Sequence, residues 1–277
     1  MSTTQHDPHP SIVGVVKSVS SMLTPLAFPP ATPTLASERY RSSRAGRGIP
    51  PVADIFLPEG EGPHPSVVLI HGGGWVLGNR RMKAMRHLST SLVQAGYAVY
   101  VPEYRMVFRG GRLDEALDDA TTAIAWWLDN ADRFGLDRSR VSMSGLSAGA
   151  TLMLLAAENH RTSGLAKLLP VFGVYDFSAM DGGIGRLIRP LLLRGRDPES
   201  VSPLHMPAPP CPVTLFHGTA DTLVPYSQAV ALRDAWSAKG GTVELVTYDG
   251  LPHAYFNYSR TEGCRQGTQD LLDALPS

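Results

Sequence analysis

"VSMSGLSAG", Val141 to Gly149, places Ser147 between two glycines, with an apolar run on one side and an alanine-rich run on the other. The apolar run is typical of a buried strand, and the alanine-rich run predicts a helix that opens at Ser147. A Gly-x-Ser-x-Gly turn at such a junction holds its serine in a strained, exposed conformation. A helix N-terminus also favours developing negative charge. We therefore predict that Ser147 is a nucleophile; the alternative is a turn serine or a helix N-cap.

Strands and helices alternate on both sides of this turn. Apolar segments predict strands at 66–71, 97–102, 140–145, 212–218 and 242–248, with one more inside 165–177 and two around the turn signal "AGRG" between about 39 and 57. Helical spacing predicts helices at 81–96, 113–135, from 147 onward, at 227–239 and at 259–274. Short apolar strands separated by helices predict an α/β fold with a mainly parallel, eight-stranded sheet covered on both faces. In such sheets ligands bind beyond the carboxyl ends of the strands.

Composition limits the classes of partner. The 277 residues fit one α/β domain, and 25 Lys and Arg balance 25 Asp and Glu without a long basic run. Nucleic acid and anionic membrane partners are therefore not indicated. No apolar stretch approaches the roughly 20 residues of a membrane span, and the first ten residues lack the features of a secretory signal. We expect a soluble, cytoplasmic protein, with a homodimer left open.

The sequence contains no recognisable motif for a metal or a cofactor. The spacing of Cys211 and Cys264 fits no metal site, and we predict free thiols, with a single disulfide as the alternative. The glycines of "HGGGWVLG" have the wrong spacing for a dinucleotide fingerprint, and no phosphate loop occurs. We expect neither a metal nor a cofactor.

The glycine run Gly72–Gly74 in "LIHGGGWVLGNR" is a second functional signal. Three glycines at a strand end cost conformational entropy unless exposed backbone is needed there. Amides of such a loop, with the amide of Ala148, can point at the oxyanion of a tetrahedral intermediate. The alternative is a flexible loop.

A serine hydroxyl needs a base, and nine histidines compete for that role. His253 in "DGLPHAYF" follows the last predicted strand and precedes the last helix. His71 and His217 each end a strand just before glycine, where an imidazole more often braces a loop. His205 in "SPLHMP" is a weaker contender. Position therefore favours His253.

The base in turn needs an acid to orient it. Asp221 in "FHGTADTLVP" follows the next-to-last strand, and Asp249 and Glu244 are the alternatives on or just after the final strand. The order Ser147, Asp221, His253 matches the chain order expected for this architecture.

The motifs "HGGGW", "GLSAG", "HGTADTLVP" and "LPHAYF" occur in an order that resembles the α/β-hydrolase superfamily over about Val52 to Ala274. Within it the chain resembles carboxylesterases with an HGGG oxyanion loop, such as the hormone-sensitive-lipase-like and small bacterial esterases. The resemblance implies Ser147 as nucleophile, His253 as general base and Asp221 as its orienting acid. It also implies an oxyanion hole formed by the amides of three residues: Gly73, Gly74 and Ala148.

Two motifs depart from the lipase-like pattern. Leu146 stands where that family usually has aspartate before the nucleophile, and its usual "DYRLAPE" appears here as "EYRMVFRGG", Glu103 to Gly111. Both departures move the match toward HGGGW esterases and arylformamidase-like or peptidase-like relatives.

The expected function is a serine hydrolase that cleaves small to medium carboxylic esters through an acyl-enzyme. The first alternative is an arylformamidase, peptidase or lactonase with the same triad. A less favoured alternative is a small-molecule receptor or a lyase on the same fold. A receptor could lose part of the triad, which is complete here. A lyase is expected to add a polar group near the serine, whereas Leu146 and Ala148 flank it.

We expect two parts in the chain. Residues 1–48 hold a helix at Ser11 to Leu26 and an extended segment that can form part of a cap, and residues 49–277 form the catalytic domain. An insertion at about 178–210, with "IGRLIRPLLL", is expected to form a small cap. The candidate substrate-binding residues, each with core packing as the alternative, are Trp75, Leu146, Tyr175, Leu187 and Leu191.

Overall fold

The computed structural model describes residues 16, 20, 21, 24–42, 49–159, 164–181 and 183–276. Most of the helix predicted at 11–26 and the turn predicted at 45–48 lie outside these residues.

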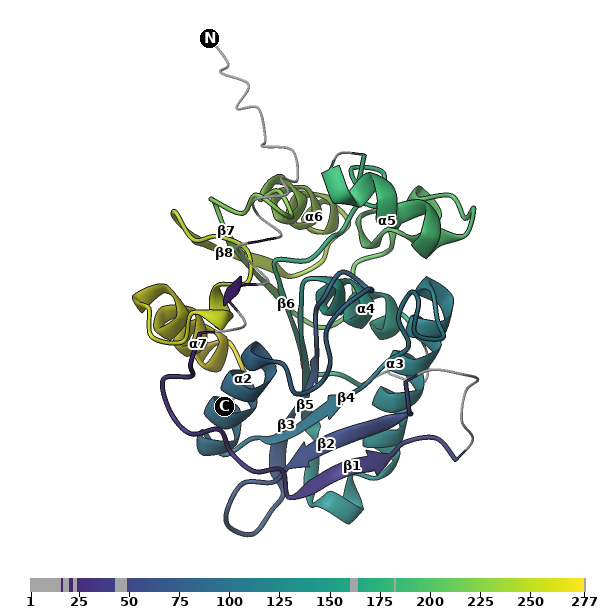
Figure 1. Cartoon of the computed structure of the whole chain (residues 1–277). Helices are drawn as coiled ribbons and strands as arrows, with labels where there is room; N and C mark the ends of the chain where they lie inside the picture. Colours follow the sequence, from purple (N-terminus) through teal and green to yellow (C-terminus); the bar gives the residue numbers. More distant parts are fainter. Residues whose placement is uncertain are drawn as a thin grey trace.

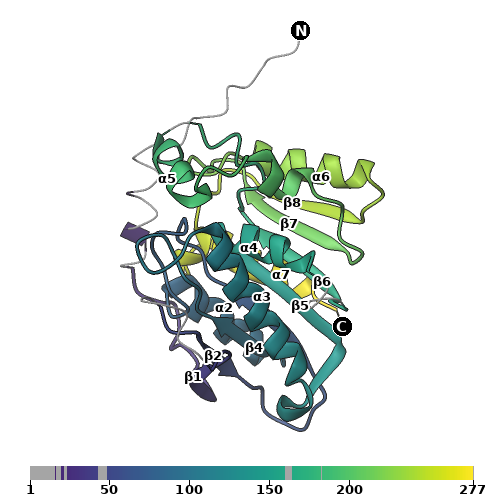
Figure 2. The same cartoon turned by 90° about the vertical axis from the view of Figure 1, so that its right-hand side faces the viewer.

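In the described part of the chain, eight strands form a single sheet in the order β1-β2-β4-β3-β5-β6-β7-β8 (Figures 1 and 2). The pairs β1–β2 and β2–β4 are antiparallel, and the other neighbours are parallel. The strands are β1 (Leu35–Arg39), β2 (Val52–Phe56), β3 (His64–Ile70), β4 (Ala98–Pro102), β5 (Leu136–Leu146), β6 (Lys167–Val171), β7 (Val213–Gly218) and β8 (Val243–Tyr248).

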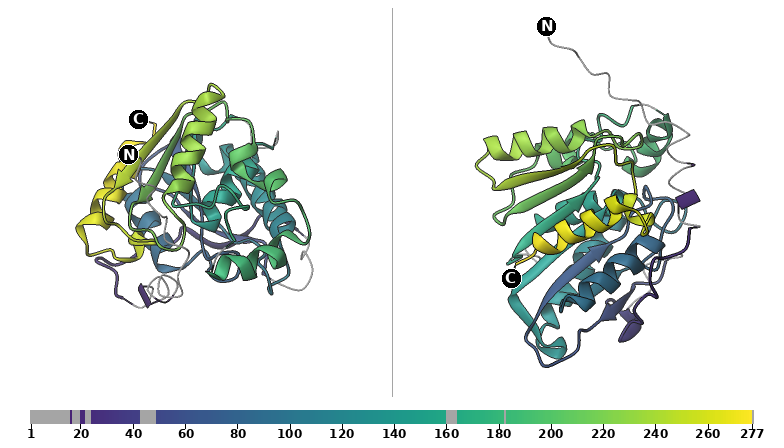
Figure 3. Two further views of the ribbon diagram at one scale, coloured as in Figure 1. Left: turned by 90° about the horizontal axis from the view of Figure 1, so that it is seen from above. Right: turned by 90° about the vertical axis from the view of Figure 1, so that its left-hand side faces the viewer.

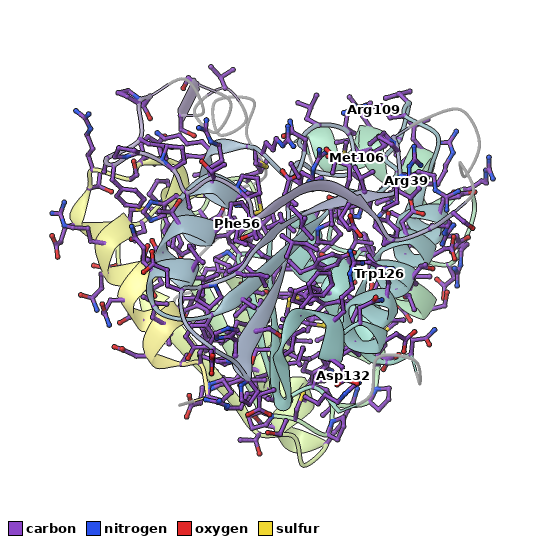
Figure 4. All side chains as sticks on the ribbon, turned by 90° about the horizontal axis from the view of Figure 1, so that it is seen from below. Arg39, Phe56, Met106, Arg109, Trp126 and Asp132 are labelled. Carbon is purple, nitrogen blue, oxygen red and sulfur yellow. The ribbon has the colours of Figure 1, made fainter. Side chains whose placement is uncertain are left out.

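Helices cover both faces of the sheet (Figure 3). On one face lie α2 (Lys83–Gln94) and α7 (Glu262–Asp273), and on the other lie α3 (Leu113–Asp129), α4 (Ala148–Ala157) and α6 (Ser227–Ala238). Successive strand residues point to opposite faces, so Val67 and Val68 of β3 belong to different core clusters. Phe56 and Trp126 lie on opposite sides of the sheet in Figure 4.

The segment between β6 and β7 lies at the top of Figure 1 and holds α5 (Gly183–Leu193). Two 3-10 turns follow it, Glu199–Val201 and Pro203–His205, and two more lie at Asp132–Phe134 and Tyr255–Asn257.

The predicted fold class is confirmed: a mostly parallel eight-stranded sheet lies between helices, and every predicted strand outside 39–57 is present with small shifts of its ends. β1 begins at Leu35, earlier than expected, because this edge strand is largely exposed and its sequence "LASER" has no apolar pattern. α7 begins at Glu262 rather than near Ser259, because the Thr261 side chain accepts a hydrogen bond from the Cys264 amide and caps the helix there.

Both cysteines are free thiols, as predicted. None of the helices in the described ranges combines the length and the apolar content needed to cross a membrane. Likewise, the described residues include no cluster of three or more His, Cys, Asp or Glu side chains arranged to hold a metal ion.

Candidate active site

Ser147 lies between the end of β5 and the start of α4 with φ 54° and ψ −120°. A non-glycine residue in this region is strained, and the tight turn explains the strain. A Cβ on Gly145 would lie 2.4 Å from the Gly149 carbonyl oxygen, and one on Gly149 would lie 2.3 Å from the Ile70 carbonyl oxygen. Both flanking glycines are therefore required by the close approach of backbone.

Three predicted residues meet at this turn. Nε2 of His253 lies 3.1 Å from Ser147 Oγ, and Nδ1 of His253 lies 2.6 Å from Asp221 Oδ2. They come from the loops that follow β5, β7 and β8, because parallel strands bring their carboxyl ends to one edge of the sheet. With Nδ1–H donating to the carboxylate, Nε2 is free to accept the serine proton.

Asp221 is held by four donors. Its Oδ1 accepts hydrogen bonds from the amides of Leu223 and Val224, both at 2.9 Å. Its Oδ2 faces His253 and also His217 Nε2, which is 3.2 Å away. Burial alone would raise the pKa of Asp221, but the charge of His253 and the hydrogen bonds from both imidazoles lower that pKa well below its usual range. The acid is therefore ionised and fixed in orientation.

The alternative acids and base lie elsewhere. Asp249 accepts a hydrogen bond from Thr219 at the surface, and Glu244 contacts Thr214. His205 is exposed in its 3-10 turn. In this geometry only Asp221 and His253 join Ser147.

The glycine run passes directly beside the serine. A Cβ on Gly72 would lie 3.2 Å from Ser147 Cβ, and Gly73 and Gly74 have φ of 122° and 61°. A Cβ on Gly73 would lie 1.9 Å from the Leu77 carbonyl oxygen. Ala148 is the first residue of α4, so its amide is among those a helix leaves without an internal partner. The predicted oxyanion residues thus border the serine from two sides.

A cavity of about 210 Å³ opens at the serine. Ser147, His253 and Gly72–Gly74 are among the residues that line it. Among the described residues no Asp, Glu, Lys or Arg side chain lines it, and its polar side chains besides Ser147 and His253 are Gln228 and Asn257. The apolar lining comprises Trp75, Val76, Leu77, Met82, Ala84, Leu146, Phe172, Val174, Ala179, Met180, Ile188, Leu223, Val224, Pro225 and Ala254. The cavity therefore suits an uncharged, apolar molecule.

The predicted substrate-binding residues divide into two groups. Trp75 and Leu146 line the cavity, whereas Tyr175, Leu187 and Leu191 do not, so the prediction was wrong for these three. Tyr175 is buried in the core, and its hydroxyl accepts a hydrogen bond from the Gly173 amide. Leu187 is 70% exposed and Leu191 41%, because α5 directs Ile188 toward the cavity instead.

Several lining residues were missed. Phe172 directly follows β6, and its ring lies edge-on to the His253 imidazole, with centroids 4.7 Å apart. Leu223 and Val224 lie in the loop after β7, five and six positions beyond its end at Gly218. Positions after the carboxyl ends of strands indicate residues near the site, so the sequence could have identified these three as lining residues. Met180 and Ile188 carried no such signal, because the course of an insertion depends on tertiary packing.

Comparison with known proteins agrees with this architecture. The family model BD-FAE matches residues 53–181. The isoprenylcysteine alpha-carbonyl methylesterase ICME of Arabidopsis thaliana is 27% identical over 252 residues, and the match covers 81% of this chain and 58% of the relative. Esterase LipC of Mycobacterium tuberculosis is 28% identical over 231 residues, covering 74% of this chain and 56% of the relative. The chain thus spans little more than half the length of these curated relatives.

Solved esterases have the same fold. The propionate-bound structure of esterase Est2 from Thermogutta terrifontis is 26% identical, covers 90% of this chain and 95% of the other, and superimposes with a TM-score of 0.71. The sheet order, the serine turn and these similarities show that the chain has the α/β-hydrolase fold. Within that superfamily the chain is similar to the BD-FAE family model over residues 53–181 and to esterases.

Proposed function

We propose that this protein hydrolyses small to medium carboxylic esters through an acyl-enzyme on Ser147. The observation that carries the proposal is the chain of contacts from Ser147 through His253 to Asp221, at a strained turn that opens into an apolar cavity. A nucleophile, a base and an orienting acid in this geometry are the parts that acyl transfer needs.

In the first half of the reaction, His253 Nε2 takes the proton of Ser147, and Oγ attacks the ester carbonyl carbon. The amides of Gly73, Gly74 and Ala148 stabilise the oxyanion. His253 then gives its proton to the alcohol oxygen as the C–O bond breaks. In the second half, water replaces the alcohol: His253 takes a proton from water, hydroxide attacks the acyl carbon, and the acid leaves as Ser147 regains its proton.

The lining supports a substrate class. Because no Asp, Glu, Lys or Arg side chain is among the described lining residues, a carboxylate or phosphate on the substrate would lose its hydration without a charged partner. The cavity volume of about 210 Å³ favours short acyl groups. Propionate bound to the Thermogutta esterase supports the same preference.

The cap predicted at 178–210 is part of the proposal. Ala179, Met180, Gly185 and Ile188 come from this segment and line the cavity. The N-terminal part also reaches the site, because Asn257 Nδ2 donates to Ser21 Oγ at 2.9 Å and Asn257 lines the cavity. We propose that both parts cover bound substrate. A cytoplasmic location and a homodimer stay predictions from the sequence.

The test is hydrolysis of p-nitrophenyl esters of increasing acyl length. We expect turnover of the acetate and butyrate, declining for long chains, and a loss of about 10⁴-fold or more in kcat for Ser147→Ala. Ser142→Ala is the matched control, because Ser142 is buried on the same strand and its hydroxyl has no hydrogen-bond partner in the described structure. Equal activity of Ser147→Ala and wild type would refute the proposal, as would inertness of wild type toward every ester.

A further inference from the structure

Strained backbone is concentrated at the cavity. In the described part of the chain, seven residues other than glycine have a positive φ. Four of them line the cavity: Trp75, Ser147, Phe172 and Ala254. The proposed mechanism accounts for the strain at Ser147 but not for that at Phe172, whose φ is 38°. A bulky aromatic residue in this region persists only where the surrounding structure holds it there.

Hydrogen bonds fix the backbone on both sides of Phe172. Its own N–H donates to the Phe216 carbonyl oxygen at 2.8 Å. The Val171 carbonyl, which belongs to the same peptide unit, accepts from the Ser147 N–H at 2.9 Å. The amide that follows Phe172 donates to the Tyr175 hydroxyl at 3.1 Å. The strained conformation is therefore held from both sides and is joined directly to the turn of the nucleophile.

The ring of Phe172 packs against the base. Phe172 is 2% exposed, and its ring centroid is 4.7 Å from that of the His253 imidazole, with 60° between the ring planes. This geometry is typical of favourable aromatic pairs. Tyr255 and Phe256 lie beside the same ring, with centroids 5.3 Å and 6.5 Å away. Because these rings are close-packed, Phe172 has little freedom to move away from the imidazole.

The hydrogen bond to the acid alone does not fix the imidazole. It holds Nδ1 of His253 at 2.6 Å from Asp221, but the terminal torsion of a histidine side chain has broad minima, so the ring can still pivot about this contact. A pivot would move Nε2 from its position 3.1 Å from Ser147 Oγ. Proton transfer requires that the two atoms stay within hydrogen-bond reach. A ring packed against the imidazole limits the pivot.

We propose that Phe172 is a positioning residue for the general base: its ring, held by a strained backbone, keeps His253 Nε2 within reach of Ser147 Oγ. The inference rests on the proposed function, because it takes His253 as the base. It gives Phe172 a role beyond lining the cavity, since the ring acts on the imidazole.

Replacement of the ring tests this role. Phe172→Leu keeps an apolar side chain in the cavity but removes the flat ring beside the imidazole. We expect kcat to fall about 10- to 10²-fold for p-nitrophenyl acetate and butyrate alike, at nearly unchanged KM, because a displaced catalytic group loses rate. Phe172→Tyr keeps the ring and should recover most of kcat. An unchanged kcat in Phe172→Leu, or an effect on KM alone that grows with acyl length, would overturn the proposal.

Phe134→Leu is the matched control. Phe134 is also a buried phenylalanine, and it stacks on Trp127 in the 3-10 turn just before β5. This turn lies at the amino end of the strand, away from the site. The control also loses a buried ring, but it should keep the kcat of wild type. Equal losses of kcat in the two leucine variants would mean that the effect comes from lost packing, and the positioning role would be wrong.

Two smaller side chains test the strain. Phe172→Gly and Phe172→Ala both remove the ring, but glycine adopts a positive φ more readily than alanine. We therefore expect the glycine variant to unfold at a higher urea concentration than the alanine variant. A more stable alanine variant would mean that the backbone at this position is not strained, and it would count against the proposal.

Nuclear magnetic resonance of the full-length protein with ¹⁵N-labelled histidine tests the role without catalysis. The hydrogen on His253 Nδ1 is identified by its loss in His253→Gln. We expect this hydrogen to exchange slowly with water in wild type and about tenfold or more faster in Phe172→Leu, because a pivoting ring breaks the bond to Asp221. Equal exchange rates, or a rapidly exchanging hydrogen in wild type, would overturn the proposal. If the exchange rates differ as expected but wild type cleaves no ester, only the proposed ester hydrolysis is refuted.

Discussion

Asp221 is held in place even without His253. His217 Nε2 is 3.0 Å from the Val224 carbonyl oxygen and 3.2 Å from the Asp221 carboxylate, and both of these oxygens are acceptors. Nε2 therefore carries the hydrogen. With the amides of Leu223 and Val224 on the other oxygen, the carboxylate cannot rotate away from His253. In the proposed mechanism, this fixed orientation keeps the Nε2 lone pair of His253 toward Ser147.

Replacing the acid tests this arrangement. In Asp221→Asn the amide has nearly the same size, but it carries no charge and can donate to Nδ1, which favours the wrong tautomer of His253. We expect kcat on the best p-nitrophenyl ester to fall about 10⁴-fold with the fold retained. Asp249→Asn, the alternative acid after β8, should match wild type. The assignment is wrong if the Asp249 variant loses activity and the Asp221 variant keeps it.

At the scale of elements, the turn between β5 and α4 is locked by contact with β3. A Cβ on Gly149 would lie 2.3 Å from the Ile70 carbonyl oxygen and 2.5 Å from that of His71. Gly149→Ala should therefore push α4 away from β3 and lower the free energy of unfolding by about 1–3 kcal/mol, measured by urea denaturation.

Gly185 in α5 has space for a side chain, so Gly185→Ala is the control for Gly149→Ala. The nearest atom to its Cβ would be 3.4 Å away, and alanine is preferred to glycine inside a helix, so this variant should be as stable as wild type or slightly more stable. If Gly149→Ala were equally stable, the close packing of the turn would not be required for the fold.

The sequence predicts the residues at the strand ends better than the residues of the insertion that line the cavity. The meeting of Ser147, Asp221 and His253 was predictable, because each follows a parallel strand and those strand ends share one edge. The cavity-facing side of α5 was not predictable. Helical spacing places Leu187 and Ile188 on the same apolar face of α5, so tertiary packing decides that Ile188 lines the cavity and Leu187 is exposed. Tyr175 illustrates the same limit, since a residue four positions after a strand can turn into the core.

At the scale of the whole molecule, buried ion pairs tie the antiparallel edge of the sheet to the site. Asp54 on β2 is 2% exposed and contacts Arg80 and Arg81, and Arg80 continues to Glu103 after β4. The sheet edge and the loop behind the glycine run are therefore joined through charges that depend on ionised carboxylates. Protonation of these carboxylates at low pH should therefore weaken the contacts of the sheet edge and of this loop at the same time.

The sign of that acid effect follows from the pKa of Asp54. Burial raises it, but hydrogen bonds from Arg81, the Ser37 amide and Arg80 outweigh burial, so the folded pKa is below the ordinary value. A carboxyl group whose pKa is lower in the folded state stabilises the fold at pH values above its unfolded-state pKa of about 4. This stabilisation is lost as the pH falls through the folded-state pKa. Wild-type stability should therefore decline below about pH 4.

Asp54→Asn isolates this contribution. Arg80 keeps its contact with Glu103, and Arg81 is half-exposed, so we expect the loss of the shared carboxylate to cost about 1–3 kcal/mol at pH 7 in urea unfolding. The difference from wild type should narrow as the pH falls below about 4 and the wild-type carboxylate becomes protonated. Asp132→Asn is the control. The Asp132 side chain, labelled in Figure 4, is 91% exposed and lies 3.5 Å from Arg138. This variant should change stability by less than about 0.5 kcal/mol at any pH. A difference for Asp54→Asn that stays constant across this range would mean that the side chain acts through packing, without a contribution from its charge.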